Sequence, residues 1–268
     1  MSGAAFEDIE TDGLVIREVK TGEADKVITL LTAEYGKITI SGKGVGSIKN
    51  RHAASAQLFS YSTFLLCKKG NYYYIRDTFF IECFMNIRYD IEKLALANYV
   101  CDVVCDLALE NVEDRDLLSL ALNTLYAIAD RDDIPSEQIK AAFEFRAAMQ
   151  AGFMPDLSSC GICGCDITDE SLLDVMNGRV ICKKCRVSLE NDPEYIKDES
   201  HAKIFIRLSY PVLSALRYLE IAPVKRFLSF SLDKPERSLL SVLCERYLLN
   251  HLEHGFSSLE YYKKIKTD

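Results

Sequence analysis

Four cysteines near the middle of the chain have the residue type and spacing of a metal site. Two residues separate Cys160 from Cys163, the same gap separates Cys182 from Cys185, and eighteen residues lie between the pairs. A two-residue gap lets both thiolates of a pair reach one metal from a tight turn, and two pairs supply four tetrahedral ligands. The intervening length falls within the window of about 15 to 20 residues that is typical of zinc sites. The pattern therefore predicts one structural Zn²⁺ ion.

Two alternatives remain open beside this prediction. A redox function for the paired cysteines would give reversible dithiol titration instead of stoichiometric metal. Cys165 competes with Cys163 for one ligand position, because it lies only two residues further along. We favour Cys163, whose gap matches that of the second pair. Four thiolates leave no open position for water, so a zinc ion here is expected to stabilise structure rather than to catalyse.

Motifs for enzymatic chemistry are incomplete in this sequence. The Gly-Lys pair at positions 42 and 43 has five residues before it, back to Gly36, and is followed by Gly44. A phosphate-binding loop needs four residues there and a following Ser or Thr. A His-x-Glu motif at His251 lies after both cysteine pairs, and neither pair follows a proline as a zinc deaminase requires. We therefore expect a protein that is not an enzyme.

The composition is that of a globular protein with packed cores. The chain has 268 residues, 49% of them apolar, and ten cysteines. The acidic start lacks the apolar segment of a secretory signal, and no run of about 18 apolar residues is present to span a membrane. We expect a cytoplasmic protein. In that reducing compartment cysteines serve as metal ligands or buried apolar residues rather than as disulfides.

Positive charge is concentrated in one segment of an acidic chain. The net charge is −8, yet residues 35–76 contain no Asp or Glu, so the other residues together carry −15. Polyanion binding depends on charge within about 10 Å rather than on the total. Solubility of edge strands is the simpler explanation, but the length of the acid-free window favours a nucleic-acid-binding face. Its seven cations are Lys37, Lys43, Lys49, Arg51, Lys68, Lys69 and Arg76.

Short apolar segments separated by Gly-containing turns predict five strands, at residues 13–18, 26–32, 37–41, 58–67 and 72–80. Five strands without an intervening helix favour a small OB-like barrel, a fold that binds single strands with a basic groove and stacked aromatic rings. Tyr72 and Tyr74 are expected on one face of the last strand and Tyr73 on the other. Which face is exposed stays open.

Beyond residue 88 the apolar spacing becomes helical. Helices are expected to begin near residue 88, to cover 116–129 and 133–152, and to resume from Ile204 to Leu219, where Pro211 breaks or kinks the stretch. A last helix is expected over 235–255. The predicted fold is α+β and multi-domain, with a five-stranded OB-like barrel followed by a helical domain that carries the four-cysteine zinc segment. The expected divisions are 1–80, 81–155, 156–190 and 191–268.

Several of these segments, in this order, resemble the bacterial DNA repair protein RecO family. The opening strands contain Gly13-Leu-Val-Ile-Arg17, Gly22-Glu-Ala-Asp-Lys26, Tyr35-Gly36-Lys37 and Gly42-Lys-Gly-Val45. Phe143-Glu144, Gly152-Phe153, Pro155 and Cys160-Gly-Ile-Cys163-Gly164 match the helix that leads into the zinc segment. Arg246-Tyr-Leu-Leu-Asn-His-Leu-Glu-His-Gly255 is similar to the closing signature. The resemblance spans nearly the whole chain.

The resemblance implies an N-terminal OB-fold, a helical domain and a zinc-bearing segment. It implies binding of single- and double-stranded DNA, annealing of complementary strands, and work with RecR to help RecA replace single-stranded DNA-binding protein, in the cytoplasm at the nucleoid. Many relatives carry a denser basic loop where this chain has Gly46-Ser47-Ile48, which implies weaker or more salt-sensitive binding. The alternative is a protein-interaction adaptor whose acidic helical half is the main functional surface.

Overall fold

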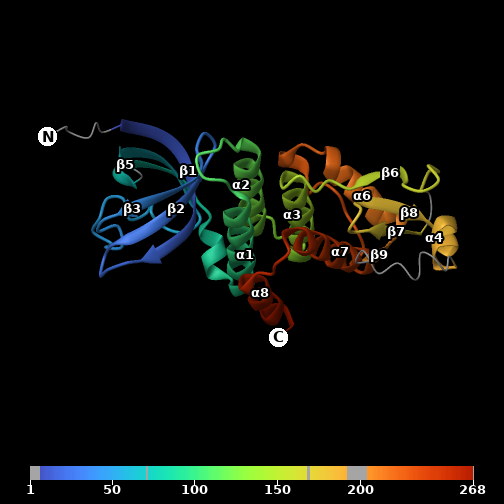
Figure 1. Cartoon of the computed structure of the whole chain (residues 1–268). Helices are drawn as coiled ribbons and strands as arrows, with labels where there is room; N and C mark the ends of the chain where they lie inside the picture. The colour runs from blue at the N-terminus through green and yellow to red at the C-terminus, as the bar shows by residue number, and fades with distance from the viewer. Residues whose placement is uncertain (1–6, 71, 168–169, 192–203, 268) are drawn as a thin grey trace. The chain divides into compact units, whose positions relative to one another are not determined.

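The computed structural model describes residues 7–70, 72–167, 170–191 and 204–267 (Figure 1). The chain divides into two compact units, one formed by the residues up to 132 together with those from 256 onward, the other by residues 133–255. The sequence-based division instead placed its first boundary at residue 80 and kept the C-terminus with the helical part. No helix in the described ranges has the length and hydropathy of a membrane span.

A closed five-stranded barrel forms the first part of the chain, and it confirms the predicted fold class. The strands are β1 (Glu7–Lys20), β2 (Lys26–Thr32), β3 (Gly36–Gly42), β4 (Ser60–Lys69) and β5 (Tyr72–Cys83). Their order around the barrel is β1-β2-β3-β5-β4. Alternate residues of β2, β3 and β4 point inward, as a period of two requires, and the core they form includes Ile28, Leu30, Ile38, Ile40, Phe64 and Leu66.

Closure of the barrel depends on a parallel contact between β3 and β5, in which Ile40 pairs with Tyr73 and Ser41 with Tyr74. This pairing decides which face of the tyrosine run is buried. Tyr73 is 6% exposed and belongs to the core, whereas Tyr72 is 68% exposed. The predicted alternation is confirmed, and the solvent-exposed face of the strand is the one that carries Tyr72.

Beside the barrel, the described residues of this unit form three helices and a short 3-10 helix. They are η1 (Met85–Tyr89), α1 (Ile91–Leu107), α2 (Arg115–Asp130) and α8 (Ser257–Thr267). Asp90 caps α1 by accepting from two backbone amides, and Asp114 caps α2. Helix α8 was not predicted from the sequence; it packs on α1, with Tyr99 and Phe256 in an edge-to-face contact beside it at 5.7 Å.

Gly36 sits where the barrel meets the segment between α1 and α2. Its φ is +55°, and a Cβ there would lie 2.3 Å from the carbonyl oxygen of Val112 and 2.5 Å from that of Leu109. Only glycine accommodates both the left-handed conformation and this close approach. The backbone amide of the next residue, Lys37, donates to Leu109 O over 2.9 Å.

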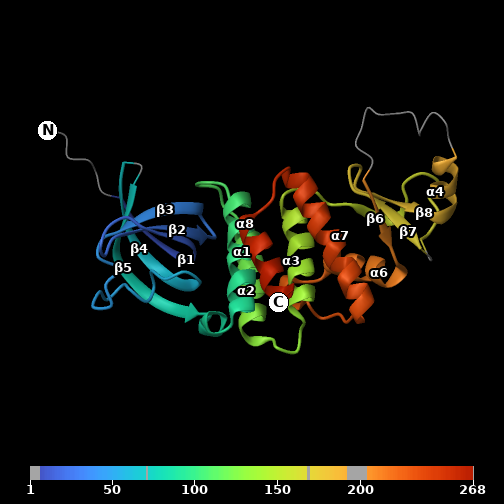
Figure 2. The same ribbon diagram turned by 90° about the horizontal axis from the view of Figure 1, so that it is seen from below.

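The second unit combines helices with a small sheet. Its helices are α3 (Ser136–Gln150), α4 (Lys183–Glu190), α6 (Tyr210–Ile221), η2 (Val224–Arg226) and α7 (Lys234–Leu252). Helices α3 and α7 lie side by side within this unit (Figure 2). Between them Lys140 Nζ lies 2.8 Å from both Glu144 and Glu245, with the first two side chains buried. Burial opposes the charge of Lys140, but the two carboxylates raise its pKa overall.

The sheet of the second unit was missed from the sequence. Its strands are β6 (Asp156–Cys160), β7 (Ser171–Asp174), β8 (Arg179–Cys182) and β9 (Phe205–Leu208), in the order β6-β8-β7-β9. The helix expected from Ile204 to Leu219 is wrong over its first residues, which contribute β9, and is confirmed over the rest, which lies in α6. The expected break near Pro211 is present and no kink forms, because the proline lies in the first turn of α6, where a helix needs no donor from its amide.

Candidate nucleic-acid interface and metal site

The four predicted metal ligands come together in the second unit. The Sγ atoms of Cys160, Cys163, Cys182 and Cys185 all lie within 4.8 Å of one another. Cys163 Sγ and Cys182 Sγ are 3.8 Å apart, which is about the separation of two thiolates bound tetrahedrally to Zn²⁺ at about 2.3 Å. The site can hold a metal ion.

Secondary structure positions each pair of cysteines. Cys160 ends β6 and enters a tight turn, in which Gly164 N donates to Cys160 O over 2.8 Å. Cys182 ends β8 and caps α4, its sulfur accepting from Cys185 N at 3.5 Å. The parallel pairing of β6 with β8 brings the two turns together.

Backbone amides around Cys160 favour its thiolate form. Burial raises the pKa of this thiol, but backbone hydrogen bonds from Cys182, Cys163 and Ile162 together lower it to about 6. The amide of Cys182 donates directly to Cys160 Sγ over 3.3 Å. Thiolates are the form that coordinates metal. The backbone amides around Cys160 stabilise this form and thereby favour metal binding.

Cys165 lies outside the group of four sulfurs that converge. Its side chain is exposed, and its hydrogen bonds to the sulfurs of Cys163 and Cys182 raise the pKa of its thiol to about 12. The sulfur of Cys163 is the one that joins Cys160 and the second pair.

The seven cations predicted to bind nucleic acid occupy different surroundings. Lys37 is half-buried, and its Nζ donates to Cys105 O over 2.6 Å in the last turn of α1. An ammonium group there satisfies a free carbonyl and the negative end of the helix dipole. Lys37 therefore has a structural role in joining barrel and helix.

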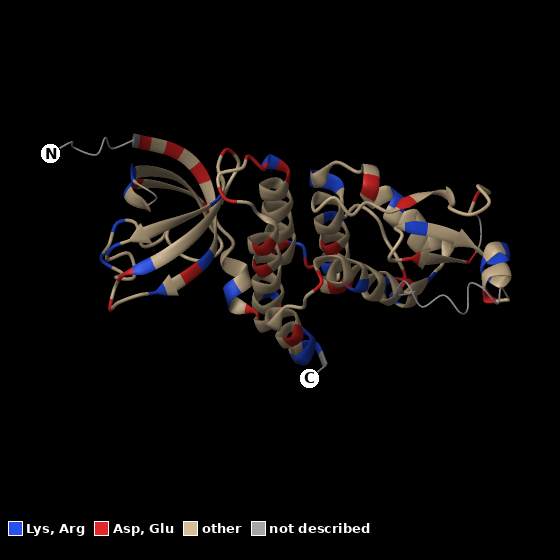
Figure 3. Ribbon diagram, in the orientation of Figure 1, with Lys and Arg blue, Asp and Glu red and all other residues tan. Residues whose placement is uncertain are grey.

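Three of the cations lie on the β3–β4 loop, residues 43–59. Lys43, Lys49 and Arg51 are all exposed, and Figure 3 shows basic residues in this loop and acidic residues along the first half of β1. Within the described part of the chain, neither Lys43 nor Lys49 has an acidic side chain within ion-pair distance. Their charges are available to an external anion.

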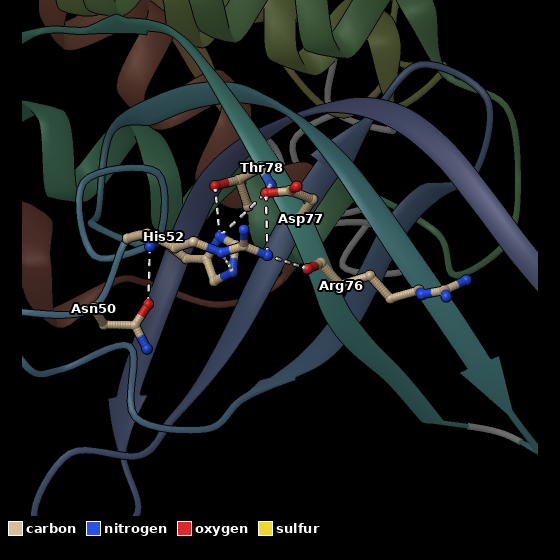
Figure 4. A network of polar contacts seen from close by, with 6 residues as sticks. Asn50, His52, Arg76, Asp77 and Thr78 are labelled. Atoms are coloured by element: carbon tan, nitrogen blue, oxygen red, sulfur yellow. Dashed lines mark hydrogen bonds and ion pairs between the residues drawn. The ribbon is translucent and has the colours of Figure 1, made fainter.

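Arg51 is tied to β5 through a polar network (Figure 4). Its guanidinium donates to Arg76 O over 3.2 Å and lies 3.7 Å from Asp77 Oδ1. The neighbouring His52 contacts Thr78 Oγ1 through Nδ1 over 3.1 Å, and Asn50 Oδ1 accepts from the amide of His52 over 2.8 Å. The loop is thereby held against the strand.

The remaining three cations lie on β4 and β5. Arg76 forms an ion pair with Asp8 of β1. Lys68 is half-buried, with its Nζ 5.4 Å from the centroid of the Tyr73 ring, and Lys69 is exposed near the hairpin turn. Strands β4 and β5 therefore present less positive charge to an external anion than the count of cations in the sequence window indicates.

Two features of this surface were missed from the sequence. Asp77 follows the acid-free window by one residue and Asp8 precedes it by 27. In the folded chain Asp77 nevertheless lies beside Arg51, and Asp8 forms an ion pair with Arg76. Lys20 and Arg88, outside the window, fold toward the β3–β4 loop. A linear charge window carries no signal for either, because strand pairing decides which residues become neighbours.

Comparison with known families matches nearly the whole chain. The family model for the recombination protein O N terminal matches residues 6–84, and the model for the recombination protein O C terminal matches residues 88–260. Among curated relatives, the DNA repair protein RecO of Acetivibrio thermocellus is 34% identical over 96% of this chain and 97% of its own length. That of Alkaliphilus metalliredigens is 28% identical, over 96% and 99% respectively.

Proposed function

Because this chain belongs to the recombination protein O family of DNA repair proteins, we propose that it is a non-enzymatic recombination mediator that binds DNA through its barrel. It anneals complementary single strands and, with RecR, helps RecA replace single-stranded DNA-binding protein. It acts on chromosomal DNA and is therefore expected in the cytoplasm at the nucleoid.

One observation carries the DNA-binding proposal. The β3–β4 loop presents Lys43, Lys49 and Arg51 together on the surface of a closed barrel. Cations at such a surface attract phosphates, and neutralising two backbones reduces the repulsion that keeps complementary strands apart. Strand annealing then needs no catalytic group.

The test is a salt series with the full chain. Binding of a labelled single strand, followed by fluorescence anisotropy, should weaken linearly with log salt, with a slope of about −0.7 for each phosphate neutralised. Changing Lys43, Lys49 and Arg51 together to Glu should abolish binding and annealing. Undiminished binding by that variant would contradict the assignment of the loop.

A charge-matched control separates the loop from the overall charge. Lys225, Arg226 and Lys234 are exposed in the second unit, and their joint replacement by Glu changes the net charge by the same amount. We expect this variant to bind and anneal nearly as the natural protein does. An equal loss in both variants would mean that total charge, not the loop, controls binding.

The partner proteins belong to the same proposal. Outside the basic window the chain carries −15, which repels DNA and supports binding of proteins by the remaining surface. The loop variant with three Glu residues should therefore still retain RecR and single-stranded DNA-binding protein in a pull-down. Loss of both partners from a correctly folded loop variant would contradict separate surfaces.

We further propose that the four cysteines hold one structural Zn²⁺ ion. A set of four thiolates suits zinc among the common metals. The ion would join the turn after β6 to the N-terminus of α4 and stabilise the second unit, with no part in DNA chemistry.

A further inference from the structure

A groove lies beside the β3–β4 loop, and all of its lining residues belong to the first unit. Its volume is about 600 Å³. One wall is the end of the β1–β2 hairpin, with Glu18, Lys20 and Lys26, and the other is the loop, with Ile48, Asn50 and Arg51 among its lining residues. Arg88 of η1 also lines it.

The hairpin wall carries an excess of positive charge. Lys20 pairs directly with Lys26 across β1 and β2, and like charges at opposite positions repel. The charge of Lys26 is neutralised by Glu18, whose carboxylate lies 2.8 Å from Lys26 Nζ. In the described structure Lys20 is exposed and has no acidic side chain within ion-pair distance, so an anion in the groove would relieve its charge.

The other two cations are held in ways that leave positive charge at the groove. Arg88 donates to the carbonyl oxygen of Leu58 over 2.7 Å, a neutral acceptor that orients the guanidinium without cancelling its charge. Arg51 shares its charge with Asp77 at 3.7 Å while 70% of its side chain stays exposed. Three cations, Lys20, Arg51 and Arg88, therefore line the same groove.

Ile48 is the large apolar side chain of the groove lining that is fully exposed, at 99%, whereas Val45 beside it is buried. Its segment is fixed to the hairpin, since Gly44 N donates to Asp25 Oδ1 over 2.7 Å and Gly46 N to Ala24 O over 2.8 Å. A fully exposed isoleucine between cations contributes nothing to the core. It can bury its surface only against an apolar surface brought by a ligand.

We propose that this groove is a subsite for single-stranded DNA, in which Lys20, Arg51 and Arg88 contact phosphates and Ile48 contacts the face of a base. The inference rests on the proposed function. In a duplex the base faces are covered by stacking, whereas an unpaired strand exposes them. Ile48 should therefore discriminate single strands from duplexes, while the cations serve both.

The test compares Ile48→Ser with Val19→Ser in the full chain, using a labelled oligothymidine and a duplex of equal length. Both side chains are exposed apolar residues of the same unit, but Val19 is not among those lining the groove. Ile48→Ser should weaken single-strand binding by about fourfold for each methylene-sized group that the base covers. It should leave duplex binding unchanged, and Val19→Ser should change neither.

Lys20→Ala tests the phosphate contacts. The slope of log affinity against log salt should become shallower by about 0.7 on the single strand, while Lys225→Ala in the second unit should leave it unchanged. An unchanged slope for Lys20→Ala, or an Ile48→Ser variant that loses duplex and single-strand affinity equally or loses neither, overturns the subsite.

The two proposals fail differently. If the loop variant with three Glu residues loses binding while Lys20→Ala and Ile48→Ser bind like the natural chain, the groove is wrong and the proposed function stands. If the natural chain binds neither DNA at low salt, both are wrong.

Discussion

Arg51 and His52 are joined through their side chains as well as their backbone, because Arg51 Nε donates to His52 Nε2 over 3.1 Å. An accepting Nε2 carries no proton, so the ring proton of this neutral histidine lies on Nδ1 and is donated to Thr78 Oγ1. Protonation of the ring would break the bond from Arg51 and place two cations side by side.

The first prediction concerns the pKa of His52. Burial and the Arg51 charge lower it, and Asp77 raises it in part, so the ring should titrate below its ordinary value of about 6.5 in a histidine-resolved NMR titration. Arg51→Gln should raise the pKa of His52 and Asp77→Asn should lower it. Arg76→Gln is the control: Arg76 lies next to Asp77 on β5, but its side chain pairs with Asp8. This change should leave the pKa of His52 unchanged.

The lowered pKa fixes the sign of the pH effect on stability. The contribution of this network is present above about pH 6.5 and is lost as the pH falls through the lower pKa of the folded state. Titration of His52 at or above its ordinary pKa would contradict the network.

The second prediction concerns the metal. Full-length protein should carry one zinc ion by elemental analysis, and Cys160→Ser or Cys185→Ser should release it and destabilise the second unit, because metal binding contributes to folding. DNA binding by the barrel should survive at temperatures where the variant stays folded.

Cys165→Ser is the matched control for the metal site. Its sulfur lies outside the converging group, so this variant should keep its zinc. Loss of zinc from Cys165→Ser but not from Cys163→Ser would reverse the choice between the two cysteines, and reversible dithiol titration without bound metal would favour a redox site.

The third prediction concerns the buried charges between α3 and α7. Lys140→Met removes the ammonium group that pairs with both the buried Glu144 and the largely buried Glu245, which should lower the free energy of unfolding by about 3–5 kcal/mol. Adding Glu144→Leu should recover part of that loss, because it removes one of the two buried carboxylates that Lys140 pairs with. Urea denaturation measures both, and a cost below about 1 kcal/mol, typical of surface pairs, would contradict the burial of the group.

The fourth prediction compares two glycines. Gly36 and Gly70 have similar φ angles of +55° and +61°, but a Cβ at Gly70 meets open space. Gly70→Ala should cost about 1–2 kcal/mol for its left-handed conformation. Gly36→Ala should cost clearly more, since its Cβ would press on two carbonyl oxygens. Equal losses of stability would show that the contact with Val112 relaxes easily.

Local pattern was sufficient for the elements that are long or punctuated. Residues 26–32 form β2 as predicted, because alternating apolar residues between turn residues suit a strand that is buried on one side. Residues 116–129 lie within α2 for the corresponding reason, with Asp114 as its cap. Pattern failed for β6 to β9, since runs of four or five residues are too short to separate strand from helix periodicity.

The sequence by itself determined the barrel fold and the set of four cysteines that converge on one site, because both depend on residue spacing within short segments. Only the tertiary structure decided that Lys37 binds the end of α1, that Asp77 shares the charge of Arg51, and that Lys20 and Arg88 line the groove beside it. These neighbours are set by strand register and barrel closure. Pairing depends on the packing of the whole unit, so the charge that a surface presents follows from the fold rather than from any window of the chain.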